Sequence, residues 1–154
     1  MNAAVTVFFL IIKVFSLYFL AVSLFGLCRR RTPEPAARLR RFAVLIAARN
    51  EESCIAGLIE SLRAQHYPPE LVDIWVLPNN CTDRTAEAAR HAGAQVLEMP
   101  ASVRSKGAAL HTAAKALLRS ARNYDAFCVF DADNEADPAF LSEMNRALDR
   151  TAIV

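Results

Sequence analysis

The chain has 154 residues, of which 54% are apolar, and its 18 basic and 16 acidic side chains give a net charge of +2. This balance excludes a disordered tail, a collagen-like repeat and a strongly basic nucleic-acid-binding arm, so no nucleic-acid partner is expected. The charge is unevenly distributed. Residues 1–41 carry seven basic and one acidic side chain, whereas residues 42–154 carry 11 basic and 15 acidic ones. An apolar, basic N-terminal segment therefore precedes an acidic domain.

Residues 3–27 form the apolar segment, in which 20 of the 25 side chains are apolar. As a helix this run would be about 38 Å long, enough to cross a hydrocarbon core of about 30 Å. No basic residue precedes it and no small-residue cleavage site follows it, which favours an anchor over a cleaved signal peptide. We therefore expect residues 1–28 to be a transmembrane signal-anchor helix that contacts the bilayer through residues 3–27, with Lys13 reaching toward the membrane surface.

Six arginines follow the apolar run, namely Arg29, Arg30, Arg31, Arg38, Arg40 and Arg41. Basic residues beside a span stay in the cytoplasm, which predicts a single-pass membrane protein with residues 29–154 on the cytoplasmic side. The sequence Thr32-Pro33-Glu34-Pro35 is expected to end the helix. Residues 29–41 would form a basic juxtamembrane linker whose arginines can contact anionic lipid head groups.

The chain has four cysteines, Cys28, Cys54, Cys81 and Cys128. They form no CxxC pair and have no histidine at ligand spacing, so a zinc site is not expected. A cytoplasmic domain keeps its thiols reduced, and we interpret all four as small core or loop residues.

Strand and helix patterns alternate along residues 42–154. Strands are predicted over residues 42–47, 72–77, 95–99 and 126–130, with a further strand beginning at Thr151. Helices are predicted from a cap at Asn50 through Leu62, from the polar loop 79–83 to about Ala92, over 106–120, and from a cap at Asp137 to about Asp149. This alternation predicts an α/β fold with a mostly parallel sheet and flanking helices, preceded by one transmembrane helix.

Polar residues cluster directly after three of the predicted strands. The clusters are Arg49-Asn50-Glu51, Asn79 to Asp83, and Asp131-Ala132-Asp133. The carboxyl ends of parallel strands share one edge of a sheet, where such folds bind ligands. One site built from three segments is therefore expected.

The acidic pair Asp131 and Asp133 indicates a metal site. Two carboxylates at the end of a buried strand need a counter-charge, which a divalent cation bound to a phosphate-bearing substrate supplies. An EF-hand is excluded because Ala136 and Ser142 occupy its glycine and glutamate positions. A dehalogenase-type phosphatase would carry its acidic pair after the first strand instead of the fourth.

Arg104-Ser105-Lys106-Gly107 opens a predicted helix whose N-terminal amides can receive phosphate. The spaced glycines of a Walker A loop are missing, so these cations are equally well interpreted as part of a solvated loop. Asn50 and Asp83 have an alternative role as helix caps, and Glu51 as a residue that complements the helix dipole.

Four motifs in order, spanning residues 42–148, resemble the family 2 glycosyltransferases, which are inverting enzymes of GT-A fold. Ala47-Ala48-Arg49-Asn50-Glu51-Glu52 resembles the opening nucleotide-contacting loop of the family, and Asn79-Asn80-Cys81-Thr82-Asp83-Arg84-Thr85 resembles its second nucleotide loop. Ser105-Lys106-Gly107-Ala108-Ala109-Leu110 is similar to the family's Gly-Lys-Gly-x-Ala-Leu segment. Asp131-Ala132-Asp133-Asn134 resembles the DxD signature, which binds Mn²⁺ or Mg²⁺ and the diphosphate of a sugar nucleotide.

The resemblance implies a GT-A-like, Rossmann-like fold and a metal-dependent, inverting transfer of sugar from a nucleotide-diphosphate sugar to an acceptor. UDP is the expected nucleotide, and polysaccharide or cell-envelope synthesis the expected setting. The implied nucleotide-sugar contacts are Ala47, Arg49, Asn50, Glu51, Asn79, Asp83, Arg104, Lys106, Gly107 and Asp131. Asp131 and Asp133 would hold Mn²⁺ or Mg²⁺.

Two features depart from the family pattern. Pro78-Asn79 stands where the family has paired Asp, so Asn79 would accept the uracil N3–H through an uncharged carbonyl. The acceptor half of the family, with its acidic general base, would follow Val154. Residues 42–154 are therefore expected to be the nucleotide-sugar-binding half of a domain truncated at its C-terminus, without the catalytic base.

Two other functions are compatible with parts of this pattern. A truncated module could bind nucleotide-sugar without transferring the sugar. A nucleotidyltransferase is expected to have a Gly-rich, basic loop after the first strand. The sequence Arg49-Asn50-Glu51 at that position argues against this class of enzyme.

Overall fold

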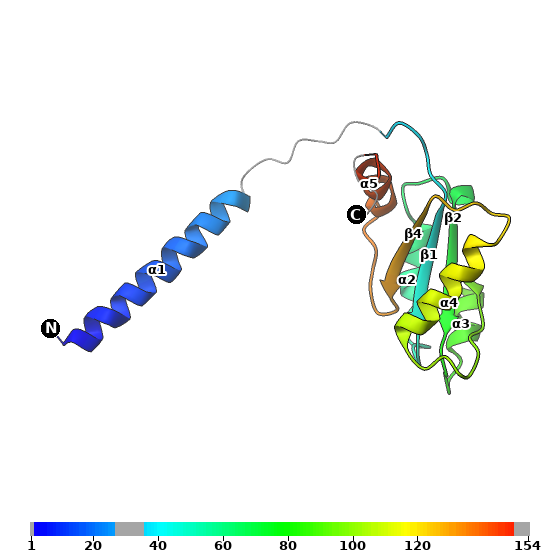
Figure 1. Cartoon of the computed structure of the whole chain (residues 1–154), viewed down its shortest axis with the longest axis horizontal. Coiled ribbons are helices and arrows are strands. Elements are labelled where there is room, and N and C mark those ends of the chain that lie inside the picture. The colour runs from blue at the N-terminus through cyan, green and yellow to red at the C-terminus, as the bar shows by residue number, and fades with distance from the viewer. Residues whose placement is uncertain (1, 27–35, 150–154) are drawn as a thin grey trace. The chain divides into compact units, whose positions relative to one another are not determined.

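The computed structural model of the protein describes residues 2–26 and 36–149, and the chain divides into two compact units, residues 1–33 and 34–154 (Figure 1). Several predicted features lie outside the described residues. They are Cys28, the arginines 29–31, the linker sequence 32–35 and the strand beginning at Thr151.

The first unit is one helix, α1, which spans Ala3–Gly26. Its segment Val5–Leu24 is long and apolar enough to cross a membrane, judged by length and composition. The large apolar side chains of that segment are 42–68% exposed on this helix. The predicted helix is confirmed, and its insertion into a membrane stays a prediction.

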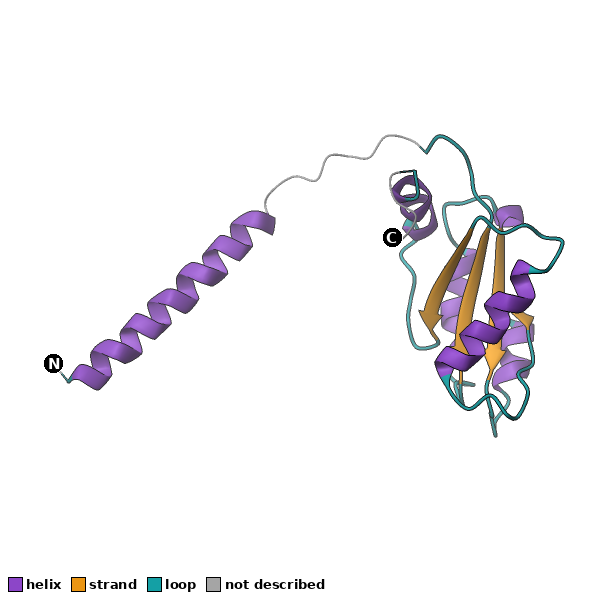
Figure 2. Cartoon of the chain, viewed as in Figure 1, coloured by secondary structure: helices purple, strands orange, loops and turns teal. Residues whose placement is uncertain are grey.

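The second unit is built on a four-stranded parallel sheet with the order β3-β2-β1-β4 (Figure 2). The strands are β1 (Phe42–Ala48), β2 (Val72–Pro78), β3 (Gln95–Val96) and β4 (Ala126–Asp131). Strand β1 lies between β2 and β4, and Val44 faces Ile74 on one side and Cys128 on the other. Residues Phe42–Ile46 are at most 2% exposed, as the continuous apolar run predicts.

Helices cover both faces of this sheet (Figure 1). On one face, α2 (Ile55–Arg63) buries its predicted stripe of Ile55, Leu58, Ile59 and Leu62 in a core that it shares with α3 (Thr85–His91). On the other face, α4 (Lys106–Leu118) packs Ala113 and Leu117 against Leu45 and Leu77. A short helix η1 (Pro69–Leu71) leads into β2, and α5 (Phe140–Ala147) packs Leu141 near Phe42 and Tyr67. The predicted α/β layers are confirmed.

Two predicted helix starts are wrong. Helix α2 begins only at Ile55, after a turn formed by residues 52–54. Asn50 lies before that turn in a left-handed conformation with φ 59°, so Asn50 does not cap the helix. Helix α5 begins at Phe140, and Asp137 instead accepts a hydrogen bond from the amide of Ala139 (2.8 Å) in the preceding turn.

The outer strands also differ from the prediction. Strand β3 has two residues in place of the predicted five. Strand β4 is not buried on both faces, because it is the last described strand of the sheet and helix α4 lies over β1 and β2. Val129 in β4 is consequently 51% exposed.

The described arginines just before β1 pair with carboxylates of their own domain, and the lipid contact of the linker stays a prediction. Arg38 pairs with Asp125 (2.9 Å) and Arg40 with Asp149 (2.7 Å). Arg41 lies 3.6 Å from Asp73, which also pairs with Arg122. Much of the charge of the predicted linker is therefore balanced inside the domain.

The turn after α3 depends on Gly93. We expect Gly93→Ala to destabilise the domain by more than about 1 kcal/mol, because its φ of +92° disfavours an L-residue and an added Cβ would lie 1.9 Å from Nη1 of Arg63. Gly57→Ala in α2 is the control, since an added Cβ there has nothing within 4 Å and alanine is favoured in helices by about 0.5–1 kcal/mol. Urea unfolding measures both variants, and equal stabilities would contradict this view of the turn.

Candidate functional site

The three predicted polar clusters meet at the carboxyl edge of the sheet. Ala47 in β1 pairs with Leu77 in β2 and with Asp131 in β4, so the loops that follow these strands leave the sheet at the same level. The amide of Asn79 donates to the carbonyl of Ala48 (3.0 Å), which extends the contact between the first two loops. Parallel pairing thus brings together residues separated by more than 80 positions in the chain.

Hydrogen bonds lock the first loop to the second. Oδ1 of Asn50 accepts from the amide of Thr82 (2.8 Å), and Oδ2 of Asp83 accepts from the amide of Glu52 (3.1 Å). The hydroxyl of Thr85, which is fully buried, accepts from the amide of Glu51 (2.9 Å) and donates to Oδ1 of Asp83 (2.5 Å). Asn50 therefore holds the two loops together without capping a helix, whereas Asp83 both ties the loops and accepts from the amide of Thr85 (3.1 Å), the first residue of α3.

The carboxylate of Asp83 is stabilised in its ionised form. The hydrogen bond from the Thr85 hydroxyl is the main cause that lowers the pKa of Asp83, and the amides of Thr85 and Glu52 add to it. An ionised acceptor with several donors makes strong hydrogen bonds, so this contact is a central tie between the loops.

A hollow of about 450 Å³ opens beside these loops and is lined by Arg49, Asn80, Ala101 and Arg104. Three strand-following segments contribute to it. Asn80 bridges two of them, because its Nδ2 donates to Oδ1 of Asn79 (2.8 Å) and to the carbonyl of Val103 (2.8 Å). Two exposed guanidinium groups and an amide make this hollow suited to an anionic, hydrogen-bonding ligand.

The residue of the second loop that lines the hollow is Asn80, whereas the motif points to Asn79. Asn79 is only 6% exposed, and its carbonyl is already bonded to Asn80. Asn80 lines the hollow and was missed by the sequence argument. Asn80 belongs to the predicted polar cluster, and its left-handed conformation, with φ 53°, is one that asparagine adopts more readily than most residues, so residue type was a further signal for it.

The basic loop and the acidic motif contact each other. Ser105 caps α4 by accepting from the amide of Ala108 (3.2 Å), and the next residue, Lys106, forms an ion pair with Asp131. Both side chains are about half exposed. Gly107 follows in the first turn, where an added Cβ would have nothing within 4 Å. The structure therefore places Lys106 at the site and not in a detached solvated loop.

Asp133 lies on the other side of the edge, beside α2. It lines a hollow of about 570 Å³ together with Cys54, Ser61 and Glu135. Burial raises the pKa of Cys54 to about 11, and the charges of Glu51 and Asp133 contribute to this rise. The thiol of Cys54 donates to Oε2 of Glu51 (3.1 Å), so the predicted nucleotide contact Glu51 is held toward α2.

The predicted metal ligands are thus next to different elements, Asp131 by α4 and Asp133 by α2. Within residues 2–26 and 36–149, no three His, Cys, Asp or Glu side chains gather into a ready-made metal site. Two carboxylates nevertheless suit Mg²⁺ or Mn²⁺, which are bound through one or two carboxylates, waters and substrate phosphates.

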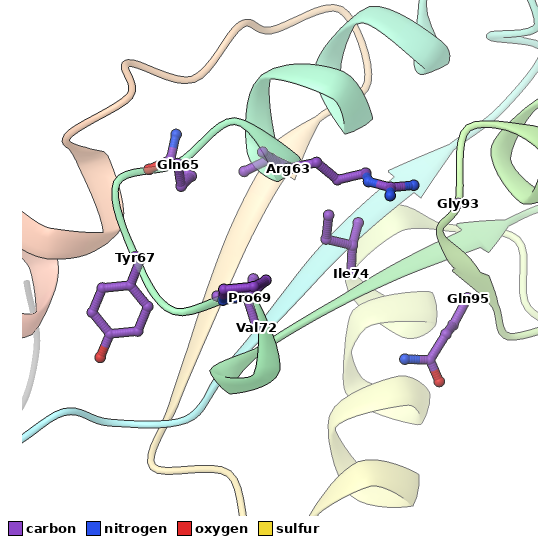
Figure 3. Close-up of a pocket in the computed structure, with 9 residues that line it drawn as sticks. Arg63, Gln65, Tyr67, Pro69, Val72, Ile74, Gly93 and Gln95 are labelled. Carbon is purple, nitrogen blue, oxygen red and sulfur yellow. The ribbon is translucent and has the colours of Figure 1, made fainter.

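A further hollow of about 280 Å³ lies at the opposite, amino edge of the sheet (Figure 3). It is lined by Leu62, Arg63, Gln65, Tyr67, Pro69, Val72, Ile74, Gly93 and Gln95. Its polar groups make internal bonds: Arg63 donates to the carbonyl of Ala92 (3.0 Å) and Gln65 to that of Asp137 (2.7 Å). No predicted site residue lines it, and we do not assign it to the candidate site.

Comparison with known proteins defines the class. The family model described as Glycosyl transferase family 2 matches residues 43–154, and the chain belongs to this family. "Probable glycosyltransferase YdaM" of Bacillus subtilis strain 168 is 28% identical over 108 residues, which are 66% of this chain and 24% of that protein. Beta-monoglucosyldiacylglycerol synthase of Nostoc sp. strain PCC 7120 is 40% identical over 43 residues, 28% of this chain and 9% of that protein. The chain thus spans a quarter or less of the length of these relatives.

Solved structures confirm the GT-A-like fold. The mannosyltransferase PcManGT from Pyrobaculum calidifontis, in complex with GDP-Man and Mn²⁺, matches 88% of this chain and 40% of its own with a TM-score of 0.68 and 21% identity. Glucosyl-3-phosphoglycerate synthase from Mycobacterium tuberculosis, in complex with Mn²⁺, UDP and glucosyl-3-phosphoglycerate, matches 62% of this chain and 36% of its own with a TM-score of 0.50 and 26% identity.

The Asp83 contact predicts a pH dependence of stability. Because folding lowers its pKa below the ordinary 3.8, its stabilising effect is complete above that pH and is lost as the pH falls through the folded-state pKa. We expect Asp83→Asn to unfold more easily at pH 7 and to match the parent chain at the acid end of the titration. Chemical unfolding at a series of pH values measures this, with Glu60→Gln on the exposed surface of α2 as control. A difference that persists unchanged in acid would contradict the role of the ionised carboxylate.

Proposed function

We propose that this chain binds the donor in a membrane-anchored glycosyltransferase that moves a sugar from a nucleotide-diphosphate sugar to an acceptor, with inversion and with a divalent cation. The carrying observation is the juxtaposition at one sheet edge of the arginine-lined hollow, the Lys106–Asp131 pair and the interlocked loops. Cations and acidic groups are both needed there, since a diphosphate requires positive charge and its metal requires carboxylates.

The hollow between Arg49 and Arg104 is the proposed nucleotide site. Its guanidinium groups can donate to phosphate oxygens, and Asn80 can donate or accept at the base or the ribose. The side-chain oxygen of Asn79 already accepts from Asn80, so it would contact the base only through its second lone pair. Because this acceptor is uncharged, we expect it to select uracil less strictly than a carboxylate would. The relatives of known structure bind GDP-Man or UDP, and UDP is our proposal for this chain.

Asp131 and Asp133 are the proposed holders of Mn²⁺ or Mg²⁺. When bound, the cation would neutralise charge on the departing diphosphate as a Lewis acid. Lys106 pairs with Asp131, and this exposed pair would let Lys106 reach a phosphate oxygen of the donor if Asp131 held a cation. Lys106 and the amides at the start of α4, including that of Gly107, would then hold the phosphate end of the donor.

The remaining parts of the proposal concern the membrane and the catalytic base. Helix α1 would anchor the chain with the domain on the cytoplasmic side. We assign no general base among the carboxylates that follow the acidic motif. Asp137 accepts from the amide of Ala139, and Glu143 forms an ion pair with Arg146. A module that binds the donor without transferring the sugar is the alternative, and binding without turnover in donor-hydrolysis and transfer assays would favour it.

The double variant Asp131→Asn, Asp133→Asn tests the metal site. We expect it to abolish the Mn²⁺-dependent part of UDP-sugar binding, a loss of at least about tenfold, since hydrogen bonds and contacts to charged groups contribute about 1.5–3 kcal/mol each. Calorimetric titration of the full chain in detergent, with Mn²⁺ or with a chelator, measures the effect. The control Glu60→Gln, Glu98→Gln removes two carboxylates elsewhere, and similar affinities for both double variants would overturn the assignment.

Arg104→Gln tests the nucleotide hollow. We expect it to weaken nucleotide-sugar binding about tenfold or more, because it removes a charged donor from the phosphate site. Arg119→Gln is the matched control, since Arg119 is an exposed arginine just beyond the other end of α4. Titration with UDP-linked and GDP-linked sugars gives both affinities and the base preference. Equal losses in the two variants would mean that the hollow does not bind the donor.

A further inference from the structure

The layer of the domain that contains α4 carries no acidic residue over a long stretch. Between Glu98 and Asp125 the sequence has five basic side chains and no carboxylate, although residues 42–154 carry 15 acidic side chains in all. Helices α2 and α3 on the opposite face each carry one glutamate and one arginine, whereas α4 carries two lysines and no acidic residue. The two faces of the sheet therefore differ in charge, in a domain whose net charge is negative.

One row of α4 presents this charge to solvent. The exposed residues His111, Lys115 and Leu118 follow each other at intervals of four and three, and together with Arg119, the residue that ends the helix, they are called the α4 face below. The opposite side of the helix is buried through Ala109, Ala113 and Leu117. Leu118 is 69% exposed, an unusual position for a leucine on an otherwise charged surface.

The lysine and arginine of the α4 face form no ion pair within the described residues. Lys106 at the start of α4 pairs with Asp131, and Arg122 after its end pairs with Asp73. Lys115 and Arg119 make no ion pair with any residue in the part of the chain that the structure describes. The arginines that precede β1 are likewise paired, at Asp125, Asp149 and Asp73. Among the described residues, Arg49 and Arg104 at the carboxyl edge also make no ion pair, so unpaired cations lie at that edge and on α4, and not on the segment before β1.

We propose that the α4 face docks the domain on the anionic surface of a lipid bilayer. Two unpaired cations beside a protruding leucine fit lipid phosphates and the edge of the acyl region. The face is too small for a nucleic acid, which is typically bound through many more phosphate contacts. The inference rests on the proposed anchor, because α1 would hold the domain near a bilayer and make a weak surface contact effective.

The single tryptophan of the chain makes this testable in the full protein. Trp75 packs with Leu110 and Tyr124 in the core beneath α4, and its Nε1 donates to the hydroxyl of Tyr124 (3.2 Å). Energy transfer from Trp75 to dansyl-labelled head groups reports the approach of this face to the membrane. The full chain is reconstituted in vesicles of phosphatidylcholine alone or with added phosphatidylglycerol, and flotation of the vesicles separately measures anchoring.

We expect stronger transfer in the vesicles that contain phosphatidylglycerol, and a decrease with added salt. Lys115→Gln with Arg119→Gln should lower the ratio of docked to undocked domain by about fivefold for each cation removed. The control Arg90→Gln with Arg146→Gln changes the net charge equally on α3 and α5 and should leave the transfer unchanged.

The outcomes separate docking from anchoring. Flotation on neutral vesicles with transfer that ignores lipid composition would keep the anchor and overturn the docking. Flotation only on anionic vesicles, lost in the Lys115 and Arg119 variant, would support docking and contradict the anchor. Equal transfer in the two double variants would overturn the assignment to α4.

Discussion

The parallel pairing of β1 with β2 and β4 is the constraint on which the rest of the domain depends. Residues Phe42–Ile46 are almost completely buried, and their backbone is hydrogen-bonded on both sides. A one-residue shift of this register would turn side chains to the wrong face of the sheet and separate the ends of the strands. Because the register is fixed by the core, Ala47, Leu77 and Asp131 lie at one level, and the polar loops that follow them form one site.

The site combines a rigid half with an adaptable half. The loops after β1 and β2 are tied by hydrogen bonds to Asn50, Asp83 and the buried hydroxyl of Thr85. The start of α4 meets the end of β4 through the ion pair of Lys106 and Asp131, whose side chains are each about half accessible. An ion pair of this kind is weak in water and can exchange partners. The proposed cation and diphosphate would bind where such an exchange is possible.

Sequence reasoning predicted the layers, the strand positions and the shared edge because these depend on apolar periodicity and on the rules of parallel sheets. It failed where a residue's role is decided by a distant partner. Asn50 is a favourable cap by residue type, but Thr82 holds it in a left-handed turn. Asn80 shows the same dependence, since its bridge to Val103 exists only in the folded domain. The arginines before β1 looked free because their partners, Asp125 and Asp149, lie more than 80 residues away.

The claim that four separate segments form one donor site can be tested most directly by hydrogen exchange on the full chain, with and without Mn²⁺ and a UDP-sugar. Our account predicts slower exchange together in residues 49–52, 79–83, 104–107 and 131–133, and no change at the amino edge of the sheet. Protection confined to one loop, or centred on the hollow between Arg63 and Gln95, would contradict it.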